Sequence, residues 1–125
     1  MSELSAGARR TAEAVDLVPL DRFREELLRL AQFFRPRTAT GSPLADAMKQ
    51  IQQNPAFAQS RLLTRVLAAL AYQEGEFRRA EAASLDSETL FMVLTLIDAY
   101  AAGKPPREDW IRAVDTARAA QLAAG

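Results

Sequence analysis

The chain has 125 residues and contains neither cysteine nor histidine. A chain of this length predicts one domain with a core of its own, and the missing residue types exclude disulfides, thiolate nucleophiles and the commonest metal ligand and general base. The 16 basic and 16 acidic side chains cancel, which argues against the positive field that nucleic-acid binding depends on. Composition therefore favours a function other than catalysis, with no cofactor and no metal.

Residues 1–18 are mostly small and polar, and we expect them to form a weakly ordered N-terminal segment. This segment lacks the apolar run of a secretory signal. No stretch of the sequence approaches the apolar length of a membrane span. The expectation is a cytoplasmic protein whose helical domain covers residues 19–125.

An amphipathic helix is predicted after Pro19, with Asp21 as its N-terminal cap. Apolar residues recur along it at three- and four-residue steps, which places them on one stripe: Leu20, Phe23, Leu27, Leu30 and Phe34. The helix should end at Arg35, because Pro36 follows. Residues 35–43 are rich in proline, glycine, serine and threonine, which predicts a flexible linker between this helix and the remainder.

Two arginines at the start of this linker form a candidate basic patch. Arg35 and Arg37 follow the Phe33-Phe34 pair, and a basic, aromatic surface is typical of contact with nucleic acid or anionic lipid. Acidic residues on the preceding helix dilute this charge. A nucleic-acid-associated regulator is therefore kept as an alternative function, with nucleic acid as the less favoured partner.

The middle of the chain predicts three further helices. Ser42 followed by Pro43 has the pattern of a cap and a first helical position, opening a short helix. Asn54-Pro55 repeats this pattern and should open a helix that runs to about Tyr72 and ends at Gly75. A short helix is then expected over residues 76–83.

The sequence Ala71-Tyr72-x-x-Gly75-x-Phe77-x-x-Ala80 resembles the turn between the two helices of a tetratricopeptide repeat. The glycine permits a tight reversal, and the small alanine leaves room for close approach of the two helices. The resemblance covers about half of one repeat. It implies a peptide-binding scaffold, which is a second alternative function.

The run from Leu90 to Ile97 is rich in branched and aromatic residues, as a buried strand would be. Because it continues between the cap Asp86 and the stop signal Gly103, a length that few strands reach, we predict a helix over 87–102. Apolar residues surround this helix, so it is either central in its own bundle or completed by another chain. The second interpretation makes one group of its residues a candidate partner-binding face: Phe91, Met92, Leu96 and Ala99.

A last helix should follow Pro105-Pro106, with Glu108 and Asp109 at its positive end and Trp110 facing inward. Together these elements predict an all-α protein, an irregular bundle of about five or six helices in a single domain. The favoured function is a non-enzymatic protein-protein interaction module or adaptor. Its expected partner is another protein or a second copy of the chain.

Overall fold

The computed structural model describes residues 16–34 and 41–124. Within these ranges the chain forms six helices and one pair of very short strands, which confirms the predicted all-α bundle. The elements in chain order are β1 (Leu17–Val18), α2 (Leu20–Ala31), α3 (Pro43–Gln53), α4 (Ala58–Tyr72), β2 (Phe77–Arg78), α5 (Arg79–Ala83), α6 (Ser87–Ala101) and α7 (Arg107–Ala123).

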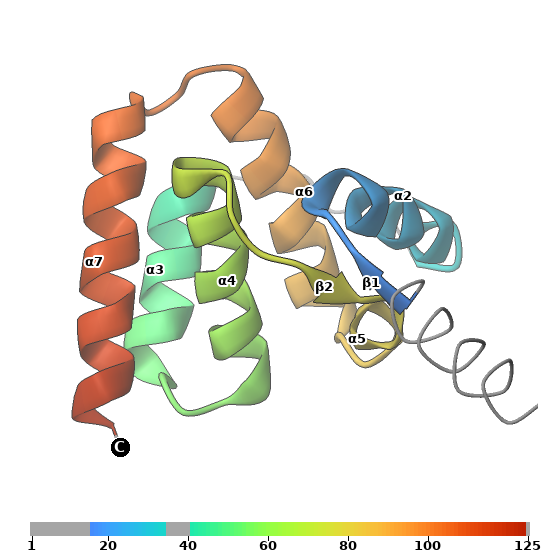
Figure 1. Cartoon of the computed structure of the whole chain (residues 1–125), viewed down its shortest axis with the longest axis horizontal. Helices are drawn as coiled ribbons and strands as arrows, with labels where there is room; N and C mark the ends of the chain where they lie inside the picture. The colour runs from blue at the N-terminus through green and yellow to red at the C-terminus, as the bar shows by residue number, and fades with distance from the viewer. Residues whose placement is uncertain (1–15, 35–40, 125) are drawn as a thin grey trace, which may run out of the picture.

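The helices form two groups joined by α6 (Figure 1). Helices α3, α4 and α7 lie side by side in one group, and α2 lies in the other together with the two strands and α5. Helix α6 runs between the groups and contacts α2, α3 and α4. It is therefore the central helix of the bundle.

Two helices begin as their capping residues predict. The Ser42 hydroxyl accepts a hydrogen bond from the Ala45 backbone N–H (3.3 Å), and Pro43 takes the first position of α3. The Asp86 carboxylate accepts a hydrogen bond from the Thr89 N–H (2.7 Å) at the start of α6. Each side chain satisfies a backbone donor that has no partner within the helix.

The first long helix is shorter than its apolar stripe predicts. Helix α2 begins after Pro19 and ends at Ala31, so Asp21 lies in the first turn and does not cap it. Phe23 and Leu27 are fully buried, whereas Phe34 lies beyond the helix and is exposed. Of the predicted linker the structure describes only the last part, which leads into the cap of α3.

The N-terminal segment and the connection after α4 differ most from the prediction. Leu17 and Val18, expected in a weakly ordered segment, pair in antiparallel register with Arg78 and Phe77, while residues 1–15 lie outside the described ranges. The helix expected from residue 76 begins only at Arg79, after β2. The segment that resembles a tetratricopeptide turn thus holds a strand and a five-residue helix, not a second long helix.

Aromatic side chains fix both groups of helices. The rings of Phe23 from α2 and Phe77 from β2 stack with centroids 4.8 Å apart. In the other group Trp110 is fully buried, and its indole N–H donates to the Pro105 carbonyl at 2.9 Å. Each large ring fills its part of the core, and the buried indole N–H has an acceptor.

Candidate functional site

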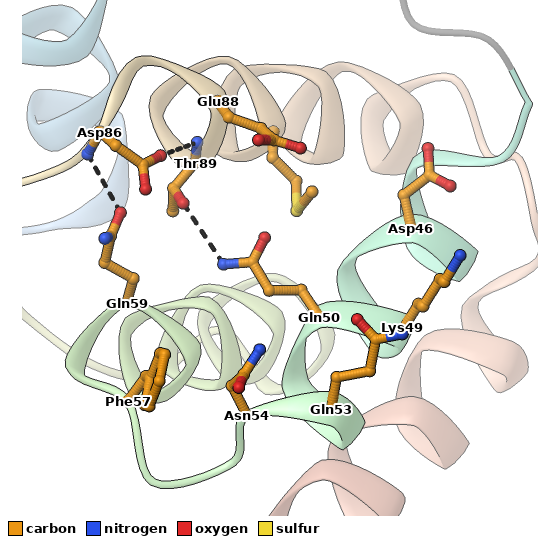
Figure 2. A pocket seen from close by; sticks show the side chains of 11 residues that line it. Asp46, Lys49, Gln50, Gln53, Asn54, Phe57, Gln59, Asp86, Glu88 and Thr89 are labelled. Carbon is orange, nitrogen blue, oxygen red and sulfur yellow. Dashed lines mark hydrogen bonds between the residues drawn. The ribbon is translucent and has the colours of Figure 1, made fainter.

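A hollow on the described surface lies between α3 and the beginning of α6, closed at one end by the connection from α3 to α4. Figure 2 shows this groove, whose volume is about 670 Å³. Its walls come from α3 and the start of α4, which are neighbours in the sequence, and from α6, which is distant from both. The lining side chains are Asp46, Lys49, Gln50, Gln53, Asn54, Phe57, Gln59, Asp86, Glu88, Thr89 and Met92. We call this hollow the α3–α6 groove.

Hydrogen bonds between the walls fix the shape of the groove. The Gln50 amide donates to the buried Thr89 hydroxyl (3.3 Å) and so ties α3 to α6. The Gln59 carbonyl oxygen accepts from the Asp86 backbone N–H (3.0 Å) and ties the start of α4 to the cap of α6. Figure 2 shows both links. Because these polar groups bond to one another across the elements, the walls are preorganised.

The groove carries an unusual number of carboxamides. Gln50, Gln53, Asn54 and Gln59 all line it, and a carboxamide offers two N–H donors and a carbonyl acceptor. A peptide backbone presents the same complementary pair of groups at every residue except proline. The lining therefore suits a ligand that needs donors and acceptors in alternation.

The charge and the apolar contacts of the groove are also defined. The lining contains three carboxylates, those of Asp46, Asp86 and Glu88, and one ammonium, that of Lys49, so these four side chains together carry a net negative charge. Phe57, at the closed end, is 63% exposed, and the half-buried Met92 lies on the α6 wall. An exposed ring beside polar groups is a feature of surfaces that bind other proteins.

The side chains predicted as a partner-binding face lie mostly inside the molecule. Leu96 is fully buried in the core, and Phe91 and Ala99 are half-buried against it. Met92 is the one member of that set that also lines the α3–α6 groove. In this structure the 87–102 helix is therefore central in its own bundle. Leu96 is not accessible to a partner.

The candidate basic patch cannot be placed, because Arg35 and Arg37 lie outside the described residues. Asp98, near the C-terminal end of α6, is exposed and accepts a hydrogen bond from the Arg24 guanidinium at 3.2 Å. This ion pair connects α6 to α2. The structure therefore gives Asp98 a role in packing two helices together.

Neither a metal site nor a membrane-spanning helix is found within the described part of the chain. No group of three or more aspartates and glutamates there is arranged to hold a metal ion. None of the helices described combines the length and the apolar character that crossing a membrane requires.

Searches of protein-family models, curated proteins and solved structures returned no match to this chain. The fold and the groove thus carry the functional argument.

The groove has a weak signal in the sequence. The end of α3 reads Lys49-Gln50-Ile51-Gln52-Gln53-Asn54, a local run of carboxamides on a helix. Such a run places more polar side chains on this short amphipathic helix than its solvent-facing side alone accounts for. Its partners Gln59, Asp86 and Met92 come from other elements, so only the fold brings the set together.

Proposed function

We propose that this protein is an adaptor that binds an extended segment of another protein in the α3–α6 groove. The observation that carries the proposal is the set of carboxamides on a preorganised wall. Small-molecule pockets are mostly apolar with few polar groups, whereas most residues of this lining are polar, with Phe57 and Met92 as the apolar ones. Hydrogen bonds to the main chain of an extended peptide give affinity without requiring one sequence.

The acidic lining selects the chemistry of the segment. Three carboxylates against one lysine favour a ligand that carries arginine or lysine side chains. The exposed Phe57 ring offers a surface for an apolar side chain or for a guanidinium group. The same charge disfavours nucleic acid, whose phosphates would face the carboxylates.

A random-peptide phage library panned on the immobilised protein tests this function. We expect the selected peptides to be enriched in basic residues with at least one apolar residue, and to shift backbone NMR signals of α3 and the start of α6. Binding should weaken as the salt concentration rises, since part of the affinity is electrostatic.

Substitutions in the groove make the test specific. Gln53→Ala and Phe57→Ala should each weaken a selected peptide by about tenfold, the loss typical of a residue that matters in an interface. Leu122→Ala is the control, because Leu122 is 83% exposed on α7 and does not line the groove. Peptides that are not enriched in basic residues, or that shift signals only elsewhere, would refute the proposal. Light scattering on the free protein separates binding of a second copy from binding of a foreign segment.

A further inference from the structure

The connection between α4 and α5 is built around the side chain of Arg65, which projects from the middle of α4. Its guanidinium donates to both Glu81 carboxylate oxygens, at 2.6 and 3.2 Å, and to the Glu76 backbone carbonyl at 2.8 Å. Glu81 in turn accepts from the Arg78 backbone N–H at 2.9 Å. One cation thus gathers a bidentate carboxylate from the first turn of α5 and a main-chain carbonyl from the connection before it.

The spacing of these acceptors matches that of a calcium-binding loop. In a helix–loop–helix of that kind, twelve residues carry a glycine at position six, a main-chain carbonyl ligand at position seven and a bidentate glutamate at position twelve. Counted from Leu70, these positions are Gly75, Glu76 and Glu81. Gly75 has a φ of 107°, so it makes the sharp turn for which that position requires glycine.

The other oxygen ligands that calcium needs are either missing from this loop or already engaged by another side chain. Positions one and three of a calcium loop supply side-chain oxygens, and here they are Leu70, which is buried, and Tyr72, whose hydroxyl donates to Asp115 at 3.3 Å. Position five is Glu74, whose carboxylate already accepts a hydrogen bond from Arg118 at 2.9 Å, so the acceptors that remain are those that Arg65 occupies. The positive charge at the centre of the loop therefore comes from the chain itself.

The guanidinium also connects the loop to the second group of helices. It lies 5.1 Å from the centre of the Phe77 ring, and this ring stacks on Phe23 of α2. The strand partner of Phe77 is Val18. Helix α5 begins two residues after Phe77, and helix α2 begins two residues after Val18. Two strand–helix units of the same form thus meet at the site that Arg65 supports.

We propose that Arg65 is a built-in cation that stands in the place of a calcium ion in the 70–81 loop, and that it holds α2 and the sheet on the bundle without a metal. The proposal is independent of the α3–α6 groove, which shares no lining residue with this loop. The loop thus has a cation site, and a side chain of the protein occupies it.

Removal of the guanidinium, followed by addition of a metal ion, tests the proposal. Arg65→Met keeps the length of the side chain and removes the charge, and it should lower the melting temperature by about 5 °C or more. Millimolar LaCl₃, a trivalent probe for calcium sites, should then recover part of this loss, because the vacated acceptors bind it only in the folded state. The wild-type melting temperature should not respond to LaCl₃ or to CaCl₂.

Arg118 provides a matched control from another helix. It also pairs with a glutamate, Glu74 (2.9 Å), and also lies over an aromatic ring, that of Tyr72 (5.7 Å), but it has no hydrogen bond to the main chain of the loop. Arg118→Met should cost less than about 2 °C and show no recovery with LaCl₃.

Three results would overturn the proposal: an Arg65→Met melting temperature equal to that of the control, a loss that no metal ion recovers, or an equal response of the wild type to the metal. The first would make Arg65 an ordinary surface cation. The second would reduce it to a common ion pair. If Arg65→Met does not fold alone, the same variant is refolded in millimolar LaCl₃: recovery of its helical circular dichroism signal supports the proposal, and no recovery overturns it.

Discussion

At the scale of single residues, burial and hydrogen bonding are closely matched in this molecule, with one exception among the described side chains. The Ser60 hydroxyl is fully buried in α4 and has no hydrogen-bond partner. Its neighbour one turn on, Thr64, donates to the Ser60 carbonyl (3.1 Å) and accepts from Gln121 of α7 (2.9 Å). The buried Ser60 hydroxyl therefore destabilises the folded state, whereas the hydrogen bonds of the buried Thr64 hydroxyl stabilise it.

This contrast predicts the sign of two substitutions. Ser60→Ala should raise the free energy of unfolding by about 0.5 to 1.5 kcal/mol, because it removes an unsatisfied buried group and adds helix propensity. Thr64→Val should lower it by about 1 to 2 kcal/mol, because Gln121 loses its 2.9 Å hydrogen bond to the hydroxyl and keeps only the longer one, 3.3 Å, to the Ser60 carbonyl. Urea denaturation measures both values. A destabilised Ser60→Ala protein would mean that the hydroxyl has a partner in solution.

The pKa of the Glu81 carboxyl is shifted by the groups that surround it. Partial burial acts to raise the pKa of the Glu81 carboxyl, but the hydrogen bonds from Arg65 and from the Arg78 backbone, together with the charges of both arginines, outweigh it and hold the pKa below its ordinary value. The charged form is thus the one that the folded protein favours. Its stabilising effect is present above the unfolded-state pKa and is lost as pH falls through the lower folded-state pKa.

At the scale of elements, sequence patterns predicted the helices that carry their own capping signals. Ser42 and Asp86 mark the starts of α3 and α6 because the side-chain cap is a local interaction. The two strands were missed, since two residues give no periodic pattern and their partners lie far apart in the chain. The helix was expected to run to about Tyr72, where α4 does end, but the left-handed residue that follows it is Gln73, with a φ of 53°, and not only the predicted stop signal Gly75.

The candidate site was less accessible to sequence reasoning than the helices were. The apolar pattern of α6 could not distinguish a central helix from one completed by another chain, because both bury all of its faces. The structure has Leu96 buried by its own bundle. The groove depends on side chains from α3, α4 and α6 together, and no local pattern specifies which elements will face one another.

The burial of Leu96 leads to a direct prediction for α6. Leu96→Glu places a carboxylate without a partner in the core and should destabilise the fold by at least about 3 kcal/mol. Ala101→Glu, on the exposed side of the same helix, should change stability by less than about 1 kcal/mol. Thermal melting followed by circular dichroism compares the two. A Leu96→Glu protein that melts like the wild type would place this face at the surface.

At the scale of the whole molecule, the two groups of helices differ in how much each buries. Helix α4 buries nine residues, whereas α2 buries only Phe23 and Leu27. The attachment of α2 relies instead on the sheet, the stacked rings and the Arg24–Asp98 ion pair. The molecule therefore has one firmly packed group and a second group whose first helix buries far fewer residues than α4 does.

Native-state hydrogen exchange should detect this difference. Amides of α2 are expected to exchange through a local opening, with protection factors lower than those of α4 by about tenfold or more. The opening should be insensitive to low denaturant concentrations if it exposes little surface. Equal protection in α2 and α4 would show that the two groups unfold only together.

The β1–β2 pairing also has a kinetic consequence. It joins residues 17 and 78, so α2, α3 and α4 all lie within the segment of chain that this contact closes. Closing a long loop costs entropy before any contact is gained, whereas α3 and α4 are neighbours in sequence and can associate with little such cost. The strand pair is consequently a late contact in folding: its ends meet only after the helices between them have shortened the distance that the chain must span.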